Sequence, residues 1–239
     1  MADDFTVTPA TPPRLPGSAP QPELLRALGR LVRGLSAIFW GLPIALIIGV
    51  QTARGDWLEP LGVFPPLAAA GMLLYGLSLL GSFQKQERIW LQALDRAKLF
   101  AVVNLGLAPF LYWWHHLPMN PFFNSMIELL CLASLLFLFT LNPVLWRLAA
   151  MLPDETLRLE TKLFTTLNRC LLVVSMTLLL GHFLLERAQQ VPPSLLSVLL
   201  RLEKGGLWVL VFLTLMPFAM TMALIWKIKE VILVSVFGK

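Results

Sequence analysis

The chain has 239 residues, of which 57% are apolar and only 14% are charged, whereas an ordinary soluble domain carries about 25% charged residues. This composition excludes a water-soluble globular protein and predicts an all-α integral membrane protein, in which the bilayer is the main solvent. The net charge of +5 does not predict nucleic acid as a partner, because the basic residues lie at the ends of apolar segments rather than in one patch.

The first segment, residues 1–22, contains six prolines and no apolar core. It therefore lacks the basic start and the hydrophobic middle of a signal peptide. A segment of this composition cannot bury apolar surface, so we expect a disordered, cytoplasmic tail. The remaining residues, 23–239, are expected to form one polytopic transmembrane helical domain.

Six apolar stretches follow, each of about the 20 residues that a helix needs to cross roughly 30 Å of hydrocarbon. Asn104 and Pro109 interrupt the third stretch, but membrane helices tolerate both residues when neighbouring helices satisfy the backbone. We expect six spans arranged as three hairpins, with approximate bounds of 34–53, 61–82, 99–116, 122–146, 163–185 and 206–226.

A short segment with leucines among charged residues precedes each odd-numbered span. These segments are Glu23 to Arg33, Glu87 to Lys98 and Asp154 to Lys162. Their pattern predicts amphipathic connectors that lie along the cytoplasmic membrane surface before the chain turns inward.

The distribution of basic residues predicts the orientation. Of the 19 Lys and Arg residues, 15 lie in the N-terminal segment, in the second and fourth loops with their flanks, or at the C-terminal end. Because cytoplasmic loops are enriched in Lys and Arg, both termini are expected in the cytoplasm. Tryptophans near the span ends, such as Trp90 and Trp146 at the inner boundary, agree with this arrangement. Compact loops with this bias fit a bacterial inner membrane.

The chain contains a short internal similarity. Lys98-Leu99-Phe100 with Asn104 recurs as Lys162-Leu163-Phe164 with Asn168, at the start of the third and fifth spans. The following spans share Thr-Leu-x-Pro at residues 140–143 and 214–217. These matches favour a repeat of hairpins, although chance agreement in an apolar sequence is a rival explanation.

Four polar residues are predicted near the outer face: His115, His116, Glu128 and His182. Imidazole and carboxylate groups are suitable ligands for several metals, so these residues could form a metal, haem or proton-handling cluster. Their spacing matches no known ligand motif. The alternative is that the histidines lie at the interface and bond to water, headgroups or neighbouring helices.

Four more polar residues are predicted in the cytoplasmic half of the spans: Asn104, Asn142, Asn168 and Arg169. Amides in this position form hydrogen bonds between helices that contribute about 1 kcal/mol each. We therefore interpret them as adhesive, with a polar substrate pocket as the alternative.

The sequence contains no Walker-type phosphate loop, no HExxH and no GxSxG, so it predicts no catalytic residue and no cofactor. Few charged residues fall inside the spans, which favours a non-catalytic accessory, scaffold or assembly subunit of a larger membrane complex. The expected partners are the lipid bilayer and either other membrane subunits or further copies of the chain. The alternatives are a small transporter or channel, and an intramembrane metal- or haem-dependent electron-transfer protein.

Overall fold

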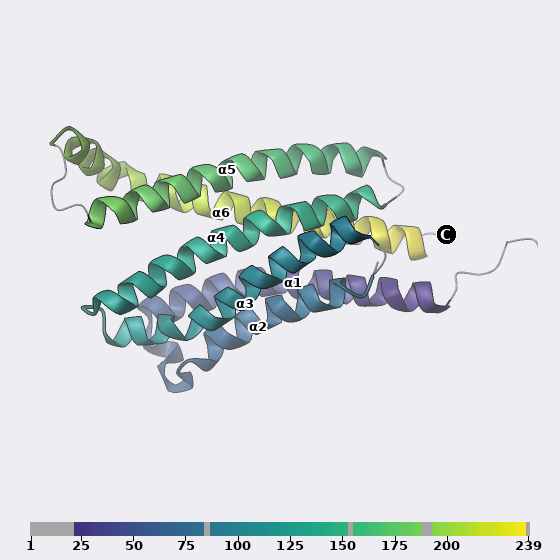
Figure 1. Ribbon diagram of the computed structural model, residues 1–239, viewed down its shortest axis with the longest axis horizontal. Helices are drawn as coiled ribbons and strands as arrows, with labels where there is room; N and C mark the ends of the chain where they lie inside the picture. The colour runs from purple at the N-terminus through teal and green to yellow at the C-terminus, as the bar shows by residue number, and fades with distance from the viewer. Residues whose placement is uncertain (1–21, 84–86, 153–154, 188–192, 238–239) are drawn as a thin grey trace, which may run out of the picture.

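A computed structural model describes the backbone of residues 22–83, 87–152, 155–187 and 193–237, and the side chains of 26–83, 87–152, 158–184 and 212–234. The predicted Pro-rich tail, apart from Pro22, lies outside the described residues. The described residues are helical throughout, apart from short connections (Figure 1). The helices are α1 (Pro22–Arg54), the 3-10 helix η1 (Asp56–Leu61), α2 (Phe64–Leu80), α3 (Arg88–His116), α4 (Pro121–Ala150), α5 (Glu155–Arg187) and α6 (Pro193–Phe237).

Four of the described helical segments are long and apolar enough to cross a membrane: Arg26–Arg54, Arg88–His116, Pro121–Ala150 and Arg158–Leu184. By helix length and composition, the chain is therefore a multi-pass membrane protein. Helix α2 is apolar but has 17 residues, so it is about 25 Å long. Helix α6 has 45 residues and includes the sixth predicted span.

Helix α2, which begins at Phe64 and ends at Leu80, lies within the second predicted span, 61–82. Gly62 has a φ of 59°, a conformation that favours glycine, and it separates η1 from α2. Pro65 and Pro66 then occupy the first turn of α2, where a missing backbone N–H costs little.

The helices pack as consecutive hairpins: α1 with α2, α3 with α4, and α5 with α6. Neighbouring hairpins contact each other through α2 and α3 and through α4 and α5, while α6 also contacts α1 and α4. Figure 1 shows that α1 begins, and α6 finishes, at the same end of the bundle. We call this the terminal end, and the other the loop end.

The predicted amphipathic connectors are not separate surface segments. Helices α1, α3 and α5 each run without interruption from the connector into the apolar stretch (Figure 1). The reason is that buried residues recur at the same helical spacing in the connector and in the apolar stretch that follows it. In α3, for example, Trp90, Leu94, Ala97 and Ala101 are all buried at helical spacing. A turn would remove these side chains from the core, so each connector extends its helix.

The tightly packed core lies in the terminal half of the bundle. Its fully buried side chains come mainly from the first halves of α1 and α3 and the second halves of α2 and α4, with part of α6 and Leu172 of α5. Examples are Leu35, Leu77, Leu145 and Ile228. Trp90 is also fully buried in this core rather than facing lipid as an interfacial ring, and its Nε1 has no hydrogen-bond partner among the described residues.

Helices α1 and α2 approach closely where Gly34 faces Gly76. A Cβ added to Gly34 would lie 2.8 Å from the carbonyl oxygen of Gly76, and one added to Gly76 would lie 3.0 Å from that of Gly34. Small residues allow two helix backbones to approach in this way, and close packing is a main source of helix association in membranes. This contact therefore fixes the first hairpin.

Candidate functional site

Three buried polar residues join α4, α5 and α6 in the terminal half of the bundle, and we call them the amide cluster. Asn168 Nδ2 on α5 donates to Asn142 Oδ1 on α4 and to Thr221 Oγ1 on α6, both at 2.9 Å. Thr221 Oγ1 in turn donates to the carbonyl oxygen of Pro217 at 2.8 Å. All three residues are at most 2% exposed. The cluster bonds three helices to one another away from solvent.

The amide cluster does not include the other two residues predicted with it. Asn104 lies on α3, and its Oδ1 accepts a long hydrogen bond of 3.5 Å from Ser134 Oγ on α4. Arg169 follows Asn168 in sequence but is exposed, with its guanidinium 5.2 Å from the centre of the Phe139 ring. The inner polar residues therefore form an amide pair, a separate asparagine and an exposed arginine.

Asn104 and Ser134 line a cavity of about 820 Å³ that lies toward the loop end. Its wall is mainly apolar and is formed by residues of α1 to α6, including Leu46, Ala108 and Leu178. The bundle is thus closely packed at its terminal end and hollow toward its loop end.

His115 and His116, which end α3, contact carboxylates of η1. His115 Nε2 lies 3.3 Å from Asp56 Oδ1, and its Nδ1 lies 3.3 Å from the carbonyl oxygen of Ala53. His116 Nε2 lies 3.4 Å from Glu59 Oε1. Asp56 and Glu59 were not among the predicted site residues, although both fall in the first predicted outer loop. These contacts attach the first loop to the end of the second hairpin.

We expect this attachment to contribute little to global stability, because its carboxylates are exposed to solvent. Replacing His115 with alanine should lower the free energy of unfolding by less than about 1 kcal/mol. The larger expected effect is local: amide hydrogen exchange in residues 56–61 should become faster, while exchange in α4 stays unchanged. Equal protection of η1 in the variant and the original protein would show that His115 does not hold the loop.

The other two predicted outer residues lie on different helices. Glu128 is half-buried on α4, and His182 is exposed on α5 with its ring 6.2 Å from the ring of Phe183. Among the described residues, no three His, Cys, Asp or Glu side chains lie close enough to hold a metal ion. Within that part of the chain, the four predicted residues are therefore not assembled as a metal centre.

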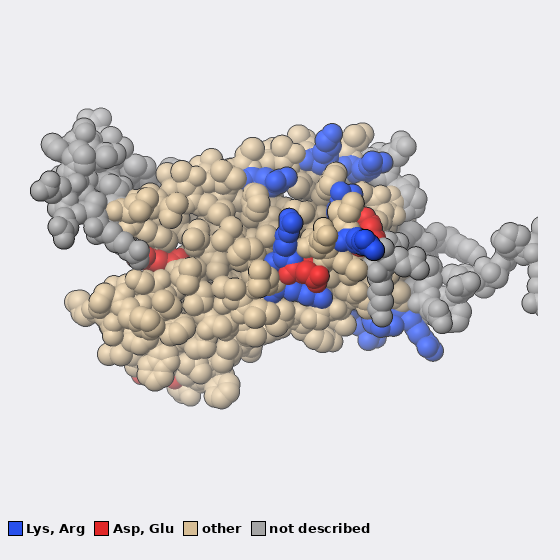
Figure 2. All heavy atoms as spheres, viewed as in Figure 1, with Lys and Arg blue, Asp and Glu red and all other residues tan. Residues whose placement is uncertain are grey.

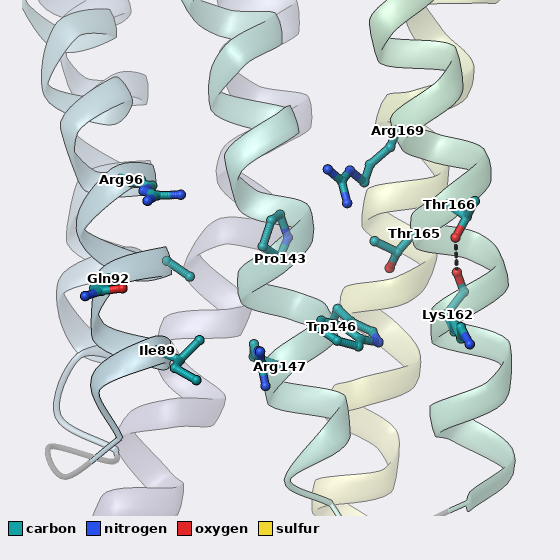
Figure 3. Close-up of a pocket in the computed structure, with 11 residues that line it drawn as sticks. Ile89, Gln92, Arg96, Pro143, Trp146, Arg147, Lys162, Thr165, Thr166 and Arg169 are labelled. Carbon is teal, nitrogen blue, oxygen red and sulfur yellow. Dashed lines mark hydrogen bonds between the residues drawn. The ribbon is translucent and has the colours of Figure 1, made fainter.

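A groove of about 370 Å³ lies between α3, α4 and α5 in the terminal half of the bundle, and we call it the basic groove (Figure 3). Four cationic side chains line it: Arg96, Arg147, Lys162 and Arg169. No Asp or Glu is among the described residues that line it. Figure 3 shows Arg96 and Arg169 extending toward each other from α3 and α5, on either side of α4. Of these four cations, only Arg169 was a predicted site residue. The sequence pattern of the other three indicated only which loops face the cytoplasm.

The groove belongs to a wider distribution of basic residues, part of which Figure 2 shows. On the face that the figure shows, the Lys and Arg side chains gather toward the terminal end, and none of the described ones lies near the loop end. In the groove, four of the cationic side chains surround a recess in the surface. Chemically, it is suited to an anion with several oxygen acceptors.

Comparisons of the chain with protein-family models, with curated proteins and with solved structures gave no match.

Proposed function

We propose that the chain crosses the membrane six times with both ends on the cytoplasmic side of a bacterial inner membrane. The shared position of the start of α1 and the end of α6 supports an even number of crossings (Figure 1). The gathering of Lys and Arg at that end supports a cytoplasmic location for it (Figure 2). A protease added to sealed inside-out vesicles should cleave the connections at the terminal end and spare those at the loop end. The reverse pattern would contradict this orientation.

Within the membrane, the chain serves as a non-catalytic accessory or scaffold subunit. The observation that carries this proposal is that no Asp, Glu, Lys, Arg or His among the described residues is buried. The buried polar residues there are hydroxyls and amides, and the best defined of them bond helix to helix. Ion pathways and proton relays commonly place ionisable groups inside the bundle, so this interior is better suited to assembly than to transport.

Helix α5 provides the surface on which a partner would pack. Only 22% of the apolar 18-residue stretch of this helix is buried, the lowest share among the four long apolar helices. Leu167 and Val174, seven residues apart on one face of α5, are 46% and 47% exposed. Another transmembrane helix could cover this face, and lipid covers it when no partner is bound.

Quantitative mass spectrometry of a tagged chain, isolated from its native membrane in mild detergent, tests the proposal. We expect one or more membrane subunits in stoichiometric amount. Changing Leu167 and Val174 to tryptophan should remove them, while tryptophans at Val102 and Val103 on α3, which are also exposed, should not. Recovery of the chain alone would contradict the accessory role, and equal recovery with both variants would contradict the use of α5.

One observation favours a second candidate, a small transporter. The cavity of about 820 Å³ is large enough for an apolar solute, and Asn104 and Ser134 lie on its wall. Glu128, and Asn104 on the cavity wall, are the residues that we expect such a transporter to need. Flux that is unchanged after Glu128→Gln and Asn104→Ala would exclude the transporter mechanism that depends on them.

A further inference from the structure

The basic groove concentrates positive charge on a chain that has little charge elsewhere in its apolar body. Its four cations come from three helices, so helix packing brings them together. None of them forms an ion pair with an Asp or Glu of the described part of the chain. Four like charges around one recess repel each other, and an anion in the recess would relieve that repulsion.

Two of the three arginines of the groove lie beside aromatic rings. The Arg147 guanidinium lies 4.9 Å from the centre of the Trp146 ring, and that of Arg169 lies 5.2 Å from the centre of the Phe139 ring. A guanidinium held beside a ring keeps N–H donors at its edge for a phosphate. Aromatic contact therefore limits the freedom of both arginines while leaving their donors available.

A buried hydroxyl on the wall of the groove adds a neutral polar group. Thr165 is 8% exposed, and its Oγ1 has no hydrogen-bond partner among the described residues. It lies one turn from both Lys162 and Arg169 on α5, and Figure 3 shows all three along one stretch of that helix. A phosphate oxygen in the groove would give this hydroxyl an acceptor.

The depth of the cations identifies the source of the anion. Arg169 lies seven residues beyond Lys162 along α5, which is about 10 Å further into the apolar part of the bundle. A soluble anion would have to leave water to reach that arginine, whereas a lipid headgroup starts at the membrane surface. Ile89 on α3 is an exposed apolar side chain that lines the groove, and it offers surface for an acyl chain.

We propose that the basic groove binds the phosphate headgroup of an anionic phospholipid, with Arg147 and Lys162 at the outer edge and Arg96 and Arg169 deeper in. Thr165 Oγ1 donates a hydrogen bond to a phosphate oxygen. This proposal depends on the membrane-spanning arrangement but not on an accessory role. Isolation of the chain without other subunits would therefore contradict the accessory role but not lipid binding. Failure to bind anionic lipid would contradict this proposal but not the accessory role.

Native mass spectrometry of the intact chain, released from nonionic micelles, is the test. Phosphatidylglycerol serves as the anionic probe and phosphatidylcholine as the zwitterionic comparison. We expect phosphatidylglycerol to bind about tenfold more tightly or better, since each basic residue near a bilayer adds substantially to its affinity for anionic lipid. Millimolar inorganic phosphate should not displace it. Equal binding of the two lipids would overturn the proposal, and displacement by inorganic phosphate would assign the groove to a soluble anion.

Charge-matched variants locate the site. Arg147→Gln with Arg169→Gln should weaken phosphatidylglycerol binding about tenfold or more. Arg30→Gln with Arg33→Gln removes the same charge from exposed positions of α1 outside the groove and should have a much smaller effect. If the two pairs of substitutions weakened phosphatidylglycerol binding equally, the lipid preference would depend only on the net charge of the chain and not on the groove. Arg147→Lys with Arg169→Lys keeps the charge and should retain most of the preference.

A photoreactive phosphatidylglycerol tests the location without any substitution. On the unmodified chain, it should label peptides from residues 89–96, 143–147 and 162–169, which line the groove. Labelling confined to other segments would overturn the proposal, even if the glutamine variants do not fold.

Discussion

Replacing Gly34 with alanine is expected to lower the free energy of unfolding by about 1–3 kcal/mol, the cost typical of inserting a methyl group into a packed interface. The new Cβ would lie 2.5 Å from Leu80 Cδ1 and 2.8 Å from the carbonyl oxygen of Gly76. The leucine side chain can rotate, but the carbonyl belongs to the backbone of α2. The two helices must therefore separate, and contacts along the first hairpin weaken with them. Unfolding in mixed micelles with a denaturing detergent measures this change.

The same chain offers controls for this prediction. Gly29 on α1 and Gly71 on α2 have no atoms within 4 Å of an added Cβ. Alanine at either position should be neutral or should stabilise the helix by up to about 1 kcal/mol, because alanine has the higher helix propensity. Gly76→Ala should resemble Gly34→Ala, since its Cβ would lie 2.7 Å from Ile38 Cγ1. Equal stability of all four variants would show that the helices do not meet at these glycines.

The second large effect is expected in the amide cluster. Asn168→Ala removes both hydrogen bonds that Asn168 donates, and should cost about 1–3 kcal/mol because each such bond in a membrane contributes about 0.6 to 1.7 kcal/mol. Asn142→Ala removes one of these two bonds and should cost less. Because the two residues share that bond, the double variant should lose less than the sum of the single losses.

Asn104 is the matched control for this cycle. It is a buried asparagine on α3, but it accepts a hydrogen bond from Ser134 at 3.5 Å, and it shares no hydrogen bond with Asn168. The losses from Asn104→Ala and Asn168→Ala should therefore add within about 0.5 kcal/mol. Coupling as strong as that between Asn142 and Asn168 would mean that the polar residues act as one network rather than as separate pairs.

The apolar stretches predicted the helices, because a backbone in hydrocarbon must satisfy its own hydrogen bonds and a helix does so within one segment. The limits of the helices were less predictable. Charged residues near Glu87 and Lys98 suggested a connector on the membrane surface, but α3 is a single helix from Arg88 to His116. One face of this segment is polar, while Trp90 and Leu94 on the other face pack in the core. Composition does not distinguish a surface helix from an extension whose apolar face is covered by neighbouring helices.

The candidate sites show a similar limit. The sequence indicated that asparagines in the spans hold helices together, and Asn142 and Asn168 do bond to each other. It did not indicate which amides meet, since that depends on the rotation of each helix. Asn104 and Arg169 were grouped with that pair by depth alone. The contacts of His115 and His116 were also missed, because their carboxylate partners lie about 60 residues earlier in the chain.

The sequence by itself determined the fold class and the multi-pass character, because apolar length and the scarcity of charge are properties of each segment and need no neighbours. The tertiary structure decided what the polar residues do. Arg96, Arg147, Lys162 and Arg169 come from three segments of the sequence and resemble ordinary markers of orientation. They form one groove only because α3, α4 and α5 pack side by side with these residues toward a common recess. The grouping of these polar residues therefore depends on the rotation of the helices, which is set by close packing in the core and is not encoded in the composition of any single span.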